Sequence, residues 1–225
     1  DKKRRTLAGM TWALDRMVGN VLDTLRKHEL EKNTLLFFVN DNGGRVPQGC
    51  SNAPLNGMKG TFLEGGIRVP FTVQWPGRLP AGVDYGHPVS SLDIFTTAMA
   101  VAGRSLPDDR EYDGVDLLPY LTGHMEGMPH ETLYWRRAQC AAIRDRQWKL
   151  IRMPDRPPLL FNLARDIGEQ NNVSALHRDV VERLMKKLFS WENELAHPLW
   201  RTDPIWIKRN VELYDREYDL TQPGA

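Results

Sequence analysis

A continuous apolar run, LLFFV at 35–39, constrains the fold of this chain more than any other feature. A strand without polar alternation is covered on both faces, as the central strands of a parallel sheet are. Apolar side chains at i, i+3 and i+4 spacing over residues 7–28 predict an amphipathic helix before it. A helix followed by a buried strand is typical of α/β domains. The sequence therefore predicts an α/β fold with residues 35–39 as a central strand.

Two kinds of element follow along the chain. The first kind continues the α/β pattern with a strand at 69–75 and helices at 90–103 and 117–121. Beyond about residue 125, short alternating runs (ETLYWR, CAAIRDRQWKLIR, PPLLFNL) predict an antiparallel sheet, and residues 176–195 predict a second amphipathic helix. The tail from residue 197 has no clear period. We expect an α/β domain over 1–124 and a small α+β antiparallel subdomain over 125–225.

The composition excludes several classes of protein. The net charge is +1 and 41% of the residues are hydrophobic, which is ordinary for a globular protein and gives no field that would attract nucleic acid or an anionic membrane. No apolar run reaches the roughly 18 residues that cross a bilayer. Cys50 and Cys140 are too few for a disulfide framework or a zinc site, and the sequence leaves open whether they pair.

The strand at 35–39 stops at an acid, an amide and two glycines, Asp41-Asn42-Gly43-Gly44. Ligands of open α/β sheets collect at the carboxyl ends of strands. The two side chains offer hard oxygen ligands, which suit Ca²⁺ or Mg²⁺, and the glycines let other backbone approach closely. The alternative is that Asn42-Gly43 makes a turn, which this dipeptide favours.

A lysine in a glycine frame follows about fifteen residues later along the chain. Lys59 stands in Gly-x-Lys-Gly at 57–60, ahead of EGGIRVP at 64–70. Such a frame presents a cation to an anionic ligand because the glycines remove steric bulk. The alternative is a solvated lysine in a loop. Glu64 and Arg68 are interpreted as a structural ion pair that shapes the loop.

The order D-N-G-G, G-x-K-G, E-G-G-I-R-V-P resembles the sulfatase family of the alkaline-phosphatase-like superfamily, and weaker likeness extends over nearly the whole chain. The resemblance implies an alkaline-phosphatase-like layered sheet with helices, present in part, and a sulfuric ester hydrolase. It implies that Asp41 and Asn42 bind an active-site divalent cation, usually Ca²⁺, and that Lys59 binds the sulfate group. It also implies a sulfated small molecule or carbohydrate as substrate, and a periplasmic, secreted or lysosomal location.

The family's nucleophile, a formylglycine made from a cysteine in C-x-P-S-R or C-x-A-x-R, lacks a convincing match. Cys140 begins C-A-A-I-R but follows the metal segment and opens a predicted strand, so it is interpreted as a chance match. Cys50 does not fit, and Asp108-Asp109 is interpreted as a turn rather than as the family's aspartate pair. We expect that this chain is the C-terminal portion of a longer sulfatase, with the nucleophile in an N-terminal half, and that alone it is inactive.

Two other functions stay open at this point. A phosphodiesterase or phosphonate monoester hydrolase of the same superfamily would share the metal scaffold and act on a different anion. A non-catalytic binding module derived from a sulfatase would have no nucleophile anywhere in its gene. The sequence identifies neither the substrate nor the oligomeric state.

Overall fold

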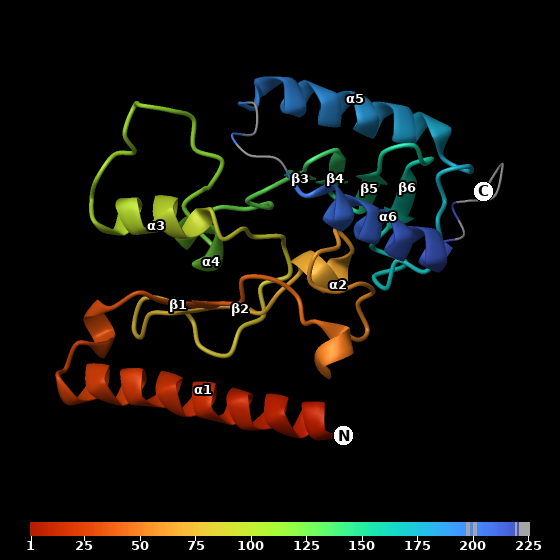
Figure 1. Cartoon of the computed structure of the whole chain (residues 1–225). Coiled ribbons are helices and arrows are strands. Elements are labelled where there is room, and N and C mark those ends of the chain that lie inside the picture. Colours follow the sequence, from red (N-terminus) through yellow and green to blue (C-terminus); the bar gives the residue numbers. More distant parts are fainter. Residues whose placement is uncertain (197–198, 200–201, 219, 221–225) are drawn as a thin grey trace. The chain divides into compact units, whose positions relative to one another are not determined.

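A computed structural model describes residues 1–196, 199, 202–218 and 220 (Figure 1). The chain divides into two compact units, Asp1–Asp41 with Pro70–Glu131, and Asn42–Val69 with Thr132–Ala225. This division differs from a single boundary at residue 124, because the glycine-rich segment 42–69 belongs with the antiparallel sheet that follows it much later in the sequence. No helix in the described part is both long and apolar enough to cross a membrane.

The first unit contains a long helix, a two-stranded sheet and two shorter helices. Its elements are α1 (Lys2–Lys27), a short 3-10 helix η1 (Glu31–Asn33), β1 (Leu36–Val39), β2 (Phe71–Gln74), α3 (Asp93–Val101) and α4 (Leu118–Leu121). The helices and strands predicted for residues 1–124 are all present. β1 pairs with β2 in antiparallel register, from Leu36 opposite Gln74 to Val39 opposite Phe71.

The parallel neighbour expected for residues 35–39 is therefore absent from the described residues. All four residues of β1 are half-buried rather than fully buried. A continuous apolar run predicts that a strand is covered, but it does not predict whether the neighbouring strand is parallel or antiparallel. The partner is antiparallel, and the class prediction, a mixed α/β fold, is confirmed.

α1 confirms the helix predicted over 7–28 and begins earlier. Asp1 caps it, since its Oδ1 accepts a hydrogen bond of 3.0 Å from the Lys3 backbone N–H. None of its residues is buried, and the side chains of Met10 and Met17 are exposed.

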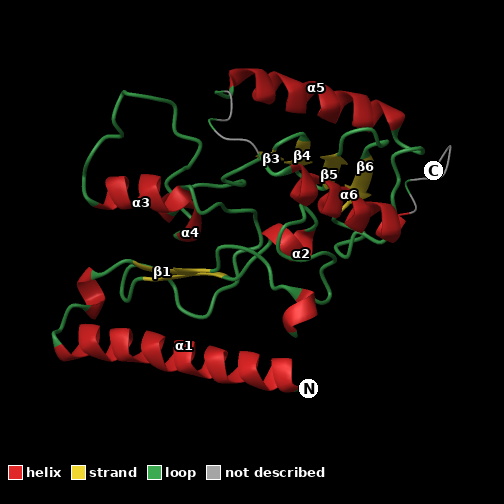
Figure 2. Cartoon of the chain, viewed as in Figure 1, coloured by secondary structure: helices red, strands yellow, loops and turns green. Residues whose placement is uncertain are grey.

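The second unit is built around a four-stranded antiparallel sheet in sequence order (Figure 2). The strands are β3 (Thr132–Arg137), β4 (Cys140–Asp145), β5 (Trp148–Arg152) and β6 (Leu159–Asn162), and the helices are η2 (Val46–Gln48), α2 (Glu64–Ile67), α5 (Arg178–Glu194) and α6 (Pro204–Tyr218). The predicted antiparallel sheet is confirmed. The run CAAIRDRQWKLIR forms two strands rather than one, because the chain turns at Arg146-Gln147, where Arg146 has a φ of 55°.

Both faces of this sheet are covered. Leu184 and Leu188 of α5 pack against one face, which includes Ile143 and Leu150 of the central strands. Tyr214 of α6 and Leu63 belong to the apolar cluster on the other face.

The helix predicted over 176–195 is confirmed as α5, with one error at its start. Leu176, expected on the buried face, precedes the helix and is 78% exposed. α6 was not predicted, because the periodicity of the aromatic and charged tail is weak.

Candidate functional site

The predicted metal ligands lie where the two units join in sequence. β1 ends at Val39, Asp41 is the last residue of the first unit's opening segment, and Asn42 begins the second unit. Asp41 is exposed and Asn42 is half-buried. Within the described part of the chain, neither side chain has a hydrogen bond or an ion pair, so their oxygens are available to a ligand.

The glycines after Asn42 allow a close approach that no other residue permits. Gly43 donates its N–H to Gly66 O at 2.9 Å, and a Cβ on Gly43 would lie 1.8 Å from Gly65 O. Gly44 N–H donates to Asn52 Oδ1 at 2.9 Å, and Asn52 Nδ2 donates back to Gly44 O at 2.9 Å. These contacts fix the backbone on which Asn42 is placed, as the predicted role of the glycines requires.

Lys59 is held beside the same segment by its backbone. Its N–H donates to Gly44 O at 3.3 Å, two residues beyond Asn42. The flanking Gly57 and Gly60 have φ values of 85° and 96°, a left-handed conformation that favours glycine. The Lys59 side chain is exposed and forms no ion pair among the described residues. The structure thus joins the lysine loop by a backbone hydrogen bond to the segment that bears Asn42, within the second unit.

The lysine loop is supported by α6, which the sequence did not reveal. Tyr214, a buried residue, accepts a hydrogen bond of 2.6 Å from the Phe62 N–H through its hydroxyl oxygen, and burial raises the pKa of that hydroxyl. Asn56 Nδ2 donates to the Tyr218 hydroxyl at 3.1 Å. From β3, the Arg137 guanidinium donates to Gly60 O at 2.9 Å. The aromatic residues of the tail were the available sequence signal for these contacts, but without a clear period they did not predict a helix.

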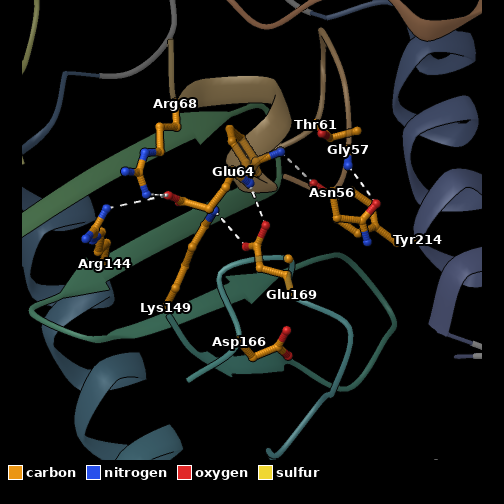
Figure 3. Close-up of polar contacts among 12 residues, drawn as sticks. Asn56, Gly57, Thr61, Glu64, Arg68, Arg144, Lys149, Asp166, Glu169 and Tyr214 are labelled. Carbon is orange, nitrogen blue, oxygen red and sulfur yellow. Dashed lines mark hydrogen bonds and ion pairs between the residues drawn. The ribbon is translucent and has the colours of Figure 1, made fainter. Parts of the chain in front are cut away.

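The ion pair predicted between Glu64 and Arg68 is present and belongs to a larger cluster (Figure 3). Arg68 Nη1 lies 3.8 Å from Glu64 Oε2, whereas Lys149 Nζ donates to Glu64 Oε1 at 2.9 Å. The same ammonium group lies 2.8 Å from Glu169 Oε1. Sequence reasoning assigned no role to Lys149 or Glu169, since contacts with Glu64 across 85 and 105 residues leave no local signal.

The two cysteines and the Asp108-Asp109 pair, considered in the sequence, are not assigned to the candidate site. Cys140 is the first residue of a strand, β4, and not of a helix. It is 4% exposed, and burial raises the pKa of its thiol. Cys50 and Cys140 are both free. Asp109 lies in an exposed loop, where hydrogen bonds from Arg110 and then Tyr112 lower the pKa of its carboxyl to about 2.

A pocket of about 300 Å³ lies in the second unit, beside the predicted site. Its walls are residues 50–57 together with Val46 and Gln170. Neither Asn42 nor Lys59 lines it, so it is not the anion site that the sequence predicted. Among the described residues no group of three or more His, Cys, Asp or Glu side chains is arranged to hold a metal ion.

Comparisons with known proteins find one family throughout. A sulfatase family model matches residues 3–104, and a model described as N-sulphoglucosamine sulphohydrolase, C-terminal, matches residues 58–194. The chain is 33% identical to steryl-sulfatase of Rattus norvegicus over 207 residues, which cover 72% of this chain and 34% of the rat protein.

Solved structures give the same result. The crystal structure of Ps i-CgsB in complex with k-i-k-neocarrahexaose has a TM-score of 0.84 and 34% identity, and the match covers 98% of this chain and 50% of that one. The phosphonate monoester hydrolase of Agrobacterium radiobacter has a TM-score of 0.65 and 26% identity, over 83% of this chain and 40% of that one. The chain therefore spans half or less of the length of these relatives.

Proposed function

The chain belongs to the sulfatase family, and we infer that it forms part of an enzyme that hydrolyses sulfate esters. The observation that carries this proposal is the position of Lys59. The proposal is supported by the Lys59 backbone N–H, which donates to Gly44 O, because the loop of this lysine then lies beside the segment that bears Asn42, and the lysine side chain has no ion pair among the described residues. A cation suits a tetrahedral oxyanion such as sulfate, and hard oxygen ligands on the neighbouring segment suit a divalent cation that would neutralise the same oxyanion.

We propose that Asp41 and Asn42 are ligands of a divalent cation, Ca²⁺ in the first instance. The donor set fits: one carboxylate and one carboxamide, without competing partners in the described part of the chain, are oxygen ligands of the kind that Ca²⁺ prefers. Since Ca²⁺ takes about six to eight oxygen ligands, the others come from beyond these two residues. When bound, the ion would neutralise sulfate oxygens and polarise the sulfur–oxygen bond.

The role proposed for Lys59 is to bind the sulfate group and to stabilise the negative charge that develops on it. The loop geometry supports this role, because the carbonyl oxygens on both sides of Lys59 accept hydrogen bonds, Met58 O from the Thr61 N–H and Gly60 O from the Arg137 guanidinium. The Lys59 side chain itself is exposed. A donor that meets the charge developing on the sulfate group contributes most in the transition state. The nucleophile, a formylglycine, is proposed to come from residues outside these 225.

We propose a sulfated carbohydrate as the substrate class, with a small sulfated molecule as the alternative. The support is the structural neighbour solved with neocarrahexaose, since 98% of this chain matches it. Steryl-sulfatase, a relative of lower coverage, supports the alternative. We also propose that the whole protein is exported, to the periplasm, the outside of the cell or a lysosome, as the family resemblance implies. Cell fractionation would check this location.

The experiment that tests the proposal uses the native protein that carries this chain. Hydrolysis of an aryl sulfate, with Ca²⁺ present and after chelation, should be compared in the wild type, in Lys59→Ala and in the control Lys27→Ala, which removes an exposed lysine of α1. We expect kcat/KM to fall about 10²–10³-fold in Lys59→Ala only. Peptide mapping should find a cysteine converted to formylglycine.

The outcomes separate the competing functions. Hydrolysis of an aryl phosphonate in preference to the sulfate would favour a phosphonate monoester hydrolase, which the similarity to the Agrobacterium enzyme makes the second candidate. A native protein without formylglycine and without hydrolysis of either ester would leave a binding module. Equal activity in Lys59→Ala and wild type would refute the role of the lysine.

A further inference from the structure

A cluster of buried charges, Glu64, Lys149 and Glu169, joins α2 to the four-stranded sheet (Figure 3). Lys149 of β5 and Glu169 are 0% exposed, and Glu64, the first residue of α2, is 1% exposed. Lys149 Nζ lies 2.9 Å from Glu64 Oε1 and 2.8 Å from Glu169 Oε1. The ammonium group therefore joins three segments that are far apart in the sequence.

Stability of the fold does not by itself explain a lysine at this position. Lys149 lies in a strand whose neighbours, Leu150 and Ile151, are fully buried. Buried ion pairs lose much of their attraction to desolvation, and well-packed apolar residues of similar volume are often as stable or more so. What the cluster does provide is a single fixed position for Glu64.

Glu64 fixes a short turn, residues 64–66, that contacts the neighbour of Asn42. Glu169 Oε2 accepts the backbone N–H of Glu64 at 2.5 Å, so both the side chain and the backbone of Glu64 are held. Two residues later, Gly66 O accepts the N–H of Gly43 at 2.9 Å. Gly43 approaches this turn so closely that a Cβ on it would lie 1.8 Å from Gly65 O, so only glycine fits there.

The same turn contacts the neighbours of Lys59. Gly65 donates its N–H to Asn56 O at 2.6 Å. A Cβ on Gly66 would lie 2.6 Å from Met58 O, the residue directly before Lys59, and 2.3 Å from Thr61 O. The turn 64–66 thus contacts both the segment that bears Asn42 and the segment that bears Lys59. Together with the direct hydrogen bond from the Lys59 N–H to Gly44 O, it holds the two backbones at a fixed spacing.

We propose that Lys149, with Glu64 and Glu169, is a positioning residue for the anion site. It holds the turn 64–66, and through the turn it fixes the separation of Asn42 and Lys59. Lys149 itself lies behind the turn and does not touch substrate. The inference rests on the proposed function for the identity of the site, while the positioning is a property of the second unit's backbone.

Hydrogen exchange tests the positioning without reference to activity. Lys149→Met removes the ammonium group, and Glu169→Gln is a milder change that keeps an acceptor for the Glu64 N–H. The control is Arg152→Met, which removes a cation from the same strand, β5, where Arg152 pairs with Glu192 of α5 at 2.6 and 2.9 Å. We expect exchange in residues 42–60 to become about tenfold faster in Lys149→Met, less so in Glu169→Gln, and to stay unchanged in the control.

Kinetics of the native protein test the consequence for the anion. The inhibition constant of inorganic sulfate and the KM for an aryl sulfate should each rise about tenfold in Lys149→Met, with a smaller change in kcat. Both constants should stay as in wild type in Arg152→Met. If Lys149→Met does not fold, the same comparison in Glu169→Gln decides.

Each result has one meaning. Unchanged exchange over 42–60 in a variant of lowered melting temperature would overturn the inference and leave the cluster with a purely structural role. Faster exchange with unchanged KM and sulfate inhibition would overturn the link to the anion site. A wild type that hydrolyses no sulfate ester would refute the proposed function, and the exchange data would still decide whether Lys149 positions the two segments.

Discussion

Removal of the Lys149 ammonium group should destabilise the second unit in a strongly pH-dependent way. In Lys149→Met the carboxylates of Glu64 and Glu169 stay buried and lose their shared cation. Arg144 and Arg68 lie 3.5 and 3.8 Å from Glu64 Oε2 and continue to offset that carboxylate. The Glu169 carboxylate keeps the hydrogen bond from the Glu64 N–H but no cation, so the cost falls mainly on Glu169.

The magnitude follows from the distances. At an effective dielectric constant of about 20, unit charges separated by roughly 2.9 Å attract by about 6 kcal/mol, and Lys149 makes two such contacts. Much of this attraction is offset because the variant no longer buries an ammonium group. Removal of one partner of a buried pair costs about 3–5 kcal/mol in practice, which we expect for the free energy of unfolding near neutral pH.

The pH dependence has a definite sign. Burial raises the pKa of Glu169, while Lys149 lowers it, so loss of Lys149 raises the pKa further. A carboxyl group whose pKa is higher in the folded than in the unfolded state binds protons more tightly when folded, and stability then increases as the pH falls through the folded pKa. Each unit by which the pKa rises recovers about 1.4 kcal/mol once the group is protonated. The loss in Lys149→Met should therefore shrink under mildly acidic conditions.

The assay is urea-induced unfolding followed by far-UV circular dichroism, at about pH 8 and about pH 5.5, for the wild type, Lys149→Met and Arg152→Met. Arg152→Met breaks a pair in which both partners are partly exposed, so we expect a smaller loss with little pH dependence. A loss below about 1 kcal/mol in Lys149→Met at the higher pH, or one of equal size at both pH values, would refute the reasoning.

Three further changes test other parts of the site. Gly43→Ala places a Cβ 1.8 Å from a backbone oxygen and should lower the free energy of unfolding by about 1–3 kcal/mol or more in thermal melts. The control Gly9→Ala, where nothing lies within 4 Å of the added Cβ, should be tolerated, and equal melting temperatures of the two variants would contradict the close approach. Tyr214→Phe removes the acceptor of the part-buried Phe62 N–H and should lower the free energy of unfolding by about 1 kcal/mol in urea unfolding; an unchanged value would contradict a supporting role for this hydrogen bond. Asp41→Asn should weaken Ca²⁺ binding at least tenfold by isothermal titration of the native protein, and unchanged affinity would remove Asp41 from the proposed ligands.

Local sequence determined most elements and the order of the candidate site residues. Apolar periodicity predicted α1 and α5, and alternation predicted the antiparallel sheet, because both patterns depend on neighbours within a few residues. The requirement for glycine beside Asn42 and around Lys59 was also readable, since it arises from local backbone geometry. Whether Asp41, Asn42 and Lys59 bind a metal ion and sulfate stays a prediction.

Tertiary structure decided which distant residues support that site. Glu64 contacts Lys149, 85 residues away, and Glu169, 105 residues away, and α6 supplies Tyr214 to the lysine loop. A lysine in W-K-L-I looks like the solvent-facing residue of an alternating strand until the loop 42–69 covers that face of the sheet. The direction of the β1 partner was equally undetermined, because an apolar strand accepts either. Local propensity is encoded by near neighbours, whereas burial, pairing and charge compensation depend on which segments the whole fold brings into contact.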